Sequence, residues 1–324
     1  MKKRIVLPAL LLLVGTQTYA QKKWTETPKN SHNIVQNQGG QTLGYSPKSG
    51  IKIIQADGLA FKDLNKNGKL DIYEDWRKPV GERAKDLASK MTVEQMAGLM
   101  LYSRHQAIPA QEAGMFTGTY NEKPFSKSGA KSSDLSDQQI AFLTKDNLRH
   151  VLMTSVESPI VAATWNNNIQ ALVEGIGMGI PSNNSSDPRN GANKDAEYNA
   201  GSGGAISQWP EELGLAATFD AAITEQFGAI AAKEYRAMGI TTALSPQIDL
   251  ATEPRWNRFV GTFGEDPKLA TDMARAYVDG FQTSPKSINA YEGWGNQSVN
   301  AMIKHWQSGG PEEGGRDGHF AYGK

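Results

Sequence analysis

The sequence contains no cysteine among its 324 residues. Disulfide bonds and a lipid-anchored cysteine are therefore both excluded. The chain also has no excess of charge of either sign, because 34 Lys and Arg residues balance 34 Asp and Glu residues. This balance gives no reason to expect nucleic acid as a partner. A composition of 39% hydrophobic and 21% charged residues is typical of one large globular domain with a small appendage.

No apolar run reaches the length of a membrane span, since the longest, residues 5–14, is too short. It follows Lys-Lys-Arg at residues 2–4, and residues 18–20 end in a small residue suited to cleavage. This order predicts a secretory signal peptide over residues 1–20. We therefore expect a periplasmic or secreted protein with no membrane contact after cleavage. An uncleaved N-terminal anchor is the disfavoured alternative.

Residues 63–74, DLNKNGKLDIYE, have the spacing of an EF-hand calcium loop. Gly68 stands where such a loop turns sharply. The six expected Ca²⁺ ligands are the side chains of Asp63, Asn65, Asn67, Asp71 and Glu74 and the backbone carbonyl of Lys69. Because only three of them are carboxylates and lysines flank them, we expect a weak, structural site. A polar turn that binds no metal is the alternative.

A second concentration of charge lies in residues 253–267, EPRWNRFVGTFGEDP. It follows an apolar run, residues 240–244, that predicts a buried strand. It precedes a helix that should begin with Asp266 as N-cap and Pro267 at the first helical position. Such a long strand-to-helix connection builds the active site in α/β barrels.

The side chains of this connection allow two interpretations. Arg255 and Arg258 could bind carboxylates or sugar hydroxyls, and Trp256 offers a flat apolar face to a sugar ring. Alternatively, the arginines form structural ion pairs with Glu265 or Asp266.

The connection resembles the signature of the family 3 glycoside hydrolases, usually DPRWGRxxExFGEDP. Glu253, Asn257 and Gly261 are departures from it. Two further segments match the family in the right order: QWPEELGLAATFD at residues 208–220 and KHWQSGGPEEGGRDGH at residues 304–319. The resemblance covers residues 58–324 and implies an α/β fold, a (β/α)8 barrel of the TIM type.

The resemblance implies a sugar site at three predicted strand ends. Asp187, in the segment Asp-Pro-Arg-Asn-Gly, would bind two hydroxyls of the non-reducing-end sugar. Arg258, Lys304 and His305 would complete the site, with Lys304 and His305 donating hydrogen bonds. Considered separately, Asp187 before a proline would predict an Asx turn, and Lys304-His305 a solvated strand end. Three polar strand ends together favour a site.

The rest of the chain predicts alternating strands and helices over an irregular N-terminal segment. We expect helices over residues 82–102, with a restart at Thr92, and over 160–173, 220–239 and 267–282. Strands should lie within residues 147–155, 177–181 and 299–303. Residues 103–137 should form a loop or insertion. Residues 21–58 should be irregular apart from a short strand at 51–54. The expected domains are the signal peptide (1–20), an extension with the calcium loop (21–80) and the barrel domain (81–324).

The sequence lacks the family's nucleophile pattern. Retaining hydrolysis needs two carboxyl groups about 5 Å apart. In the family, one is an Asp in a Ser/Thr-Asp-Trp pattern on a late strand, and the other usually comes from a following domain. Asp75-Trp76 comes too early. We therefore expect an incomplete barrel with no catalytic residue, the nucleophile and acid/base beyond Lys324, and no hydrolysis by this chain alone.

The leading hypothesis is an exo-acting, retaining β-glucosidase-like hydrolase of β-linked oligosaccharides, with no catalytic cofactor. A β-N-acetylhexosaminidase of the same family is the alternative enzyme, because Asp317-Gly318-His319 has the form of that branch's acid/base pair. However, the usual Gly-His-Gly is absent and the spacing from His305 is longer. A non-catalytic, calcium-dependent carbohydrate-binding protein is the alternative from another class.

Overall fold

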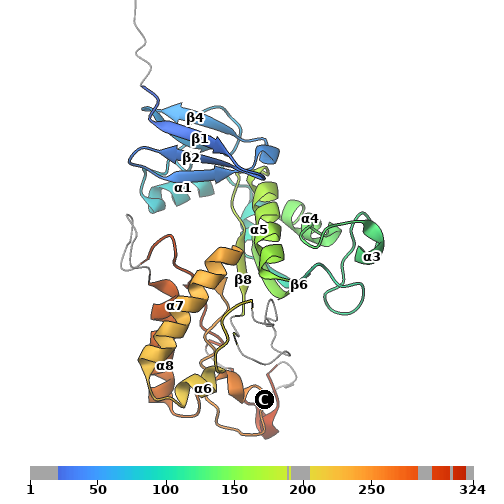
Figure 1. The fold of residues 1–324 in the computed structure, drawn as a ribbon, viewed down its shortest axis with the longest axis vertical. Helices are drawn as coiled ribbons and strands as arrows, with labels where there is room; N and C mark the ends of the chain where they lie inside the picture. The colour runs from blue at the N-terminus through green and yellow to red at the C-terminus, as the bar shows by residue number, and fades with distance from the viewer. Residues whose placement is uncertain (1–20, 188–189, 191–204, 284–293, 307–308, 319–324) are drawn as a thin grey trace, which may run out of the picture. The chain divides into compact units, whose positions relative to one another are not determined.

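The computed structural model describes residues 21–187, 190, 205–283, 294–306 and 309–318 (Figure 1). The chain divides into two compact units, Met1–Asp86 and Leu87–Lys324, and the division falls within helix α1 (Val80–Lys90). The predicted signal peptide lies outside the described residues. Within the described ranges, no helix has both the length and the apolar character that a membrane span requires.

The first unit contains regular strands, so the expectation of an irregular segment over residues 21–58 was wrong. Three strands pair antiparallel in the order β1-β2-β3, and two more form a hairpin. Their bounds are β1 Trp24–Pro28, β2 Asn33–Asn37, β3 Thr42–Tyr45, β4 Lys52–Ala56 and β5 Leu59–Asp63, with a short 3₁₀ helix, η1, at Pro47–Ser49. The hairpin turns at Asp57 and Gly58, both with positive φ, as a type I′ turn requires. The polar composition concealed these strands because β1 is largely exposed.

In the second unit, the described strands form one parallel sheet in the order β6-β7-β8-β9-β10. The strands are β6 Tyr102–Ile108, β7 His150–Val156, β8 Asn183–Ser186, β9 Thr242–Ala243 and β10 Asn300–Ala301. A backbone bridge between Gln247 and Lys304 continues the pairing beyond β9 and β10. Parallel strands in sequence order, with helices between them, are typical of an α/β barrel wall.

The helices of the second unit begin and end largely where local capping residues predict. They are α2 Val93–Leu99, α3 Phe125–Ser128, α4 Asp137–Thr144, α5 Pro159–Glu174, α6 Glu212–Ala216, α7 Ala221–Met238 and α8 Pro267–Gln282, with 3₁₀ turns η2 Phe259–Gly261 and η3 Glu313–Gly315. Asp220 caps α7, which ends at Gly239 in a left-handed conformation. Asp266 caps α8 by accepting from the Leu269 amide at 2.7 Å. Thr92 caps α2, so the predicted restart is confirmed.

Two strands differ from the expectation. Strand β6 lies where the sequence predicted the end of a helix and the start of a loop, and its irregular burial and shifted register weaken the period-2 pattern. The strand expected at residues 177–181 is a turn, with positive φ at Gly177 and Gly179. The real strand, β8, is Asn-Asn-Ser-Ser. Its buried polar side chains bond to neighbouring strands, as Ser186 does to the Met153 carbonyl at 2.8 Å, so no apolar run marks it.

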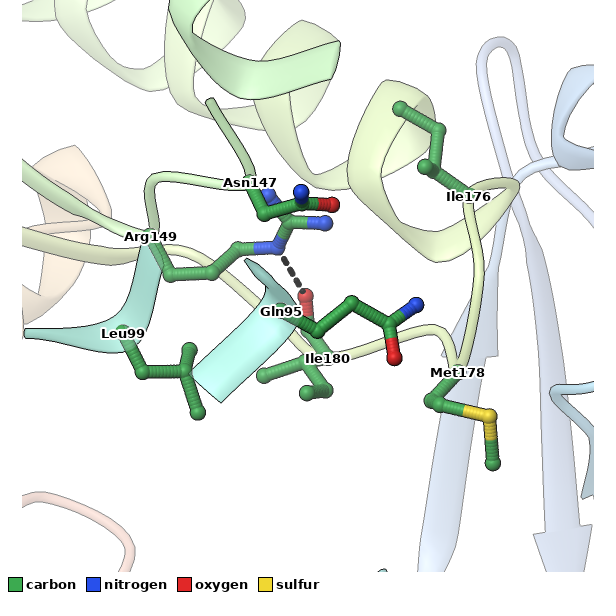
Figure 2. Close-up of a pocket in the computed structure, with 7 residues that line it drawn as sticks. All are labelled: Gln95, Leu99, Asn147, Arg149, Ile176, Met178 and Ile180. Atoms are coloured by element: carbon green, nitrogen blue, oxygen red, sulfur yellow. Dashed lines mark hydrogen bonds between the residues drawn. The ribbon is translucent and has the colours of Figure 1, made fainter. Parts of the chain in front are cut away.

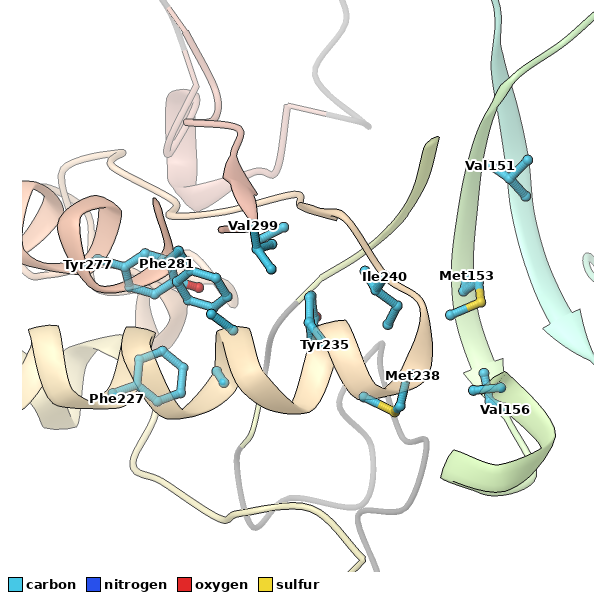
Figure 3. Packing of buried hydrophobic residues seen from close by; sticks show 14 of the residues in the cluster. Val151, Met153, Val156, Phe227, Tyr235, Met238, Ile240, Tyr277, Phe281 and Val299 are labelled. Atoms are coloured by element: carbon cyan, nitrogen blue, oxygen red, sulfur yellow. The ribbon is translucent and has the colours of Figure 1, made fainter. Parts of the chain in front are cut away.

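The core of the second unit is built around α7 and α8, which lie side by side (Figures 1 and 3). Phe227, Tyr277 and Phe281 gather between them, with the Tyr277 and Phe281 rings stacked at 4.9 Å. The helices approach closely at Gly228 and Gly280. A Cβ at Gly280 would lie 2.3 Å from the Glu225 carbonyl oxygen, so any other residue would force the two helices to shift.

Packing closes the region where β7 begins. Arg149 is buried there, and its guanidinium donates to the Ile180 carbonyl at 3.0 Å (Figure 2). It also donates to the Leu143 carbonyl at 2.9 Å. Burial lowers the pKa of Arg149. The hollow beside it has a volume of about 10 Å³, enough for one water molecule. This hollow is too small for a ligand larger than a water molecule.

Candidate functional site

Polar residues follow the C-terminal ends of three adjacent strands. Asp187 comes directly after β8, Ser245 and Asp249 come after β9, and Lys304-His305 follow β10. Because these strands are parallel neighbours, their ends meet at one edge of the sheet. The sequence therefore brings these side chains together through strand order alone.

A cavity of about 160 Å³ opens at this edge. It is lined by His105, Leu152, Thr154, Asp187, Leu244, Arg258, Lys304 and His305. All four residues that the sequence predicted to bind substrate, Asp187, Arg258, Lys304 and His305, thus line one cavity. The lining thus includes one carboxylate, two cationic side chains and two imidazoles, and the apolar side chains of Leu152 and Leu244.

Asp187 and Lys304 form a buried ion pair at the base of this group. The Lys304 ammonium donates to Asp187 Oδ2 at 2.6 Å, and the two side chains are only 10% and 8% exposed. The Ser245 hydroxyl donates to the other carboxylate oxygen at 3.1 Å. The Asp187 carboxylate thus bonds to two residues that lie far along the chain.

His305 is held by a carboxylate that the sequence analysis did not identify. Asp249 Oδ2 lies 2.7 Å from His305 Nδ1, and Asp249 is buried. Asp249 follows β9 by several residues, in a segment predicted only as part of a connection. Its burial and its contact with His305, which lies 56 residues away, are products of folding, so no local sequence signal marks it.

Arg258 reaches the cavity from the loop after β9. Its guanidinium donates to Gln247 Oε1 at 3.2 Å and lies 3.6 Å from Asp317 Oδ2. Its neighbour Arg255 instead forms an exposed pair with Glu253 at 2.7 Å. These partners differ from Glu265 and Asp266, which the ion-pair alternative had named.

Trp256 does not present its face to a ligand, so the expectation of a sugar-stacking platform was wrong. Its side chain is 1% exposed, and its indole N–H donates to Asp317 Oδ2 at 2.9 Å. A tryptophan between Arg255 and Asn257 on a polar loop looks exposed in sequence. Here Asp317, which lies 61 residues away, provides the polar partner that allows the ring to be buried.

Asp317 therefore holds the signature loop through Trp256 and Arg258. The same carboxylate was considered as half of the Asp317-Gly318-His319 acid/base pair. His319 lies outside the described residues. The described contacts of Asp317 give it a structural role and add no support for the hexosaminidase alternative.

His105 and Thr154 are two further cavity residues that the sequence analysis missed. His105 Nδ1 lies 2.9 Å from the Thr154 hydroxyl, and its ring stacks on Phe116. His105 was missed because β6 was assigned to a loop. Thr154 lay within the predicted strand 147–155, where a buried threonine near the strand end was the available signal.

The predicted calcium loop, in the first unit, has the backbone of a sharp turn, with Gly68 at φ +74°. Asp63 accepts from the backbone amides of Asn67 and Gly68, both at 3.0 Å. Glu74 accepts from the Leu64 amide at 2.7 Å and from the Asp71 amide at 3.0 Å. Two buried carboxylates are therefore directed inward across the loop.

The other predicted ligands satisfy one another. The side-chain amides of Asn65 and Asn67 each donate to Asp71 Oδ2 at 2.7 Å, and the Lys69 amide donates to Asn67 Oδ1 at 2.7 Å. In the described part of the chain, no three or more His, Cys, Asp or Glu side chains form a group that could hold a metal ion. The carboxylate and amide groups suit Ca²⁺ chemically, but both amides would have to turn their oxygens inward.

Comparison with known proteins gives a consistent result. The model of the glycosyl hydrolase family 3 N terminal domain matches residues 122–323. The chain is 43% identical over 276 residues to a periplasmic beta-glucosidase/beta-xylosidase of Dickeya chrysanthemi, which covers 85% of this chain and 39% of that protein. It is 36% identical over 262 residues to a probable beta-glucosidase C of Aspergillus oryzae, covering 80% of this chain and 37% of that one. The chain thus spans less than half the length of these relatives.

A solved structure supports the same fold. A β-glucosidase from Erythrobacter marinus superposes with a TM-score of 0.54 at 23% identity, covering 76% of this chain and 28% of that one. At this identity the likeness concerns the fold alone. It agrees with the parallel, sequentially ordered sheet described above.

Proposed function

The chain belongs to glycosyl hydrolase family 3, and from this premise we propose that its polar cavity binds the terminal sugar of a β-linked glycoside. The complete enzyme would be an exo-acting, retaining β-glucosidase-like hydrolase of carbohydrate catabolism. The observation that carries the proposal is the meeting of Asp187, Arg258, Lys304 and His305 in one cavity. A volume of about 160 Å³ suits a single sugar ring and favours an exo-acting site.

The chemistry of the cavity suits a polyhydroxylated ligand. The Asp187 carboxylate accepts hydrogen bonds, whereas Lys304 and Arg258 only donate them. Their charges are already compensated by Asp187 and Asp317, so a neutral sugar can enter without an unpaired charge being buried. Hydrogen bonds from such fixed groups assist catalysis when they strengthen in the transition state.

We assign no nucleophile within the cavity. Its one carboxylate among the described lining residues, Asp187, is bonded to Lys304, which suits a binding role. From the resemblance to the family we infer that neither the nucleophile nor the acid/base is among the described residues that line the cavity. The matched Dickeya and Aspergillus relatives are longer than this chain, which is compatible with that inference. Hydrolysis of β-glucosides by the whole protein is therefore part of the proposal.

Sugar binding by this chain tests the proposal directly. Saturation-transfer NMR with cellobiose and laminaribiose should show contact, and Asp187→Ala should abolish it. Asp272→Ala is the matched control, because Asp272 is exposed on α8 and should leave binding unchanged. Equal binding by the parent and the Asp187 variant would move the sugar site elsewhere. Stronger contact with N-acetylglucosamine than with glucose would favour the hexosaminidase alternative.

We infer that the loop at residues 63–74 binds Ca²⁺ weakly and stabilises the N-terminal unit. The inward carboxylates of Asp63 and Glu74 and the left-handed Gly68 support this inference. Weak affinity, on the order of 10⁻⁴ to 10⁻³ M, is expected because ligand amides must reorient and few ligands are charged.

Thermal unfolding of the chain with and without millimolar Ca²⁺ tests the calcium site. The parent should melt at a higher temperature with Ca²⁺, and Glu74→Gln should remove that increase. Glu82→Gln, an exposed position on α1, is the control that should retain it. If Ca²⁺ does not change the melting temperature of the parent, the loop is a hydrogen-bonded turn that binds no calcium.

We further infer a periplasmic or secreted location. The pattern of residues 1–20 supports it, and the Dickeya relative is named as periplasmic. Cell fractionation with N-terminal sequencing should find a mature chain that begins at Gln21. Recovery of the uncleaved chain from the cytoplasm would contradict the inference.

A further inference from the structure

We propose that Asp249 is a positioning residue that fixes His305 in its Nδ1–H tautomer. His305 Nε2 then accepts a hydrogen bond from a sugar hydroxyl in the cavity. The second step rests on the proposed function, whereas the tautomer is a property of the free protein. This assignment reverses the expectation from sequence, in which His305 donates.

The contacts of Asp249 determine the direction of the bond. An ionised carboxylate has no proton to give, so at 2.7 Å from Asp249 Oδ2 the His305 Nδ1 must carry the hydrogen. The other oxygen, Oδ1, faces the His305 backbone amide at 3.4 Å. A Cβ at Gly309 would lie 2.2 Å from Oδ1, so the backbone there closes over the carboxylate. Asp249 therefore has little freedom to turn away from the imidazole.

The exposure of the two side chains shows which edge of the ring meets the ligand. The Asp249 side chain is 3% exposed, whereas that of His305 is 35% exposed and lines the cavity. A neutral imidazole has one N–H. When the single N–H is at Nδ1 and donates to Asp249, the other ring nitrogen, Nε2, carries a lone pair.

An acceptor at this place complements the rest of the cavity. Lys304, the residue before His305, only donates, and so does Arg258. A sugar hydroxyl can accept one hydrogen bond and donate another. His305 Nε2 thus adds an acceptor to the one that Asp187 provides, and neighbouring hydroxyls can use both of their hydrogen-bonding functions.

The tautomer is measured first, in the parent chain without ligand. Long-range ¹H–¹⁵N NMR of the protein labelled with ¹⁵N-histidine at pH 8 separates the two ring nitrogens. The chain has five histidines, and the signals lost in His305→Gln identify His305. We expect hydrogen on Nδ1 and a lone pair on Nε2. A ring with hydrogen on Nε2, alone or on both nitrogens, would overturn the proposal.

Ligand binding is measured second, by titration with cellobiose. Asp249→Ala should shift His305 toward the Nε2–H form and weaken binding about tenfold, the equivalent of one hydrogen bond. A glutamine at 305 can offer its amide oxygen near the Nε2 position without help from Asp249. Adding Asp249→Ala to His305→Gln should therefore cost no further affinity. A further tenfold loss would mean that Asp249 acts through the loop structure and not through His305.

The two parts of the experiment separate this proposal from the proposed function. A parent that shows the Nδ1–H tautomer and binds no sugar would refute the sugar site and leave the Asp249 assignment in place. A parent that binds cellobiose with hydrogen on His305 Nε2 would refute the Asp249 assignment alone.

Discussion

Lys304→Met tests the buried ion pair on which the cavity is built. The substitution keeps the apolar stem of Lys304 and removes its charge, so it opens no large void. It leaves the Asp187 carboxylate, 8% exposed, without its cation. Removing one partner of a buried pair typically costs about 3–5 kcal/mol. Because Ser245 still donates to Asp187, we expect the lower end, about 3 kcal/mol.

Urea unfolding measures this loss. With an m-value near 3 kcal/mol/M for a unit of this size, a loss of about 3 kcal/mol lowers the midpoint by about 1 M. The double variant Asp187→Asn with Lys304→Met replaces the pair by neutral groups. It should return to within about 1 kcal/mol of the parent, because neither member of the pair is then left as an unpaired buried charge.

Lys268→Met is the matched control, since Lys268 is exposed on α8 and should change stability by less than about 0.5 kcal/mol. A loss under about 1 kcal/mol for Lys304→Met would show that Asp187 is not buried as a charge. A double variant as unstable as the single one would refute the charge-pair reasoning, because packing would then be the cause.

Further predictions concern acid stability, packing and activity. The Arg77 guanidinium lowers the pKa of Asp75 below its ordinary value of 3.8, so this carboxylate stabilises the fold fully above pH 3.8 and loses that contribution as the pH falls through the lowered pKa. Asp75→Asn should therefore lower the melting temperature at pH 6 and differ less from the parent below pH 3.8; a pH-independent difference would contradict this. Gly280→Ala should cost about 1–3 kcal/mol in urea unfolding, because its Cβ meets the backbone of α7, and an unchanged midpoint would mean that α7 and α8 can separate there. The 324-residue chain alone should hydrolyse neither an aryl β-glucoside nor an aryl N-acetyl-β-glucosaminide, whereas glucosaminide turnover that is lost in His319→Ala would place an acid/base within it.

The sequence by itself determined those features that depend on residues close together in the chain. The ends of α7 and α8 follow from Asp220, Gly239 and Asp266, since capping bonds join residues two or three positions apart. The four predicted sugar-site residues also reached one cavity, because each follows or lies on the connection after a strand, and parallel strands align their ends.

The tertiary structure alone decided which polar groups are buried and which partners they have. Strand β8 is recognisable only through its neighbours, which accept bonds from its serines. Trp256 can be buried because its indole N–H donates a hydrogen bond to Asp317. Asp249 contacts His305, although the two residues are 56 positions apart in the sequence. The free energy of burying a polar side chain depends on whether a partner is present, and those partners are brought near by folding. No local pattern around Trp256 or Asp249 contains that information.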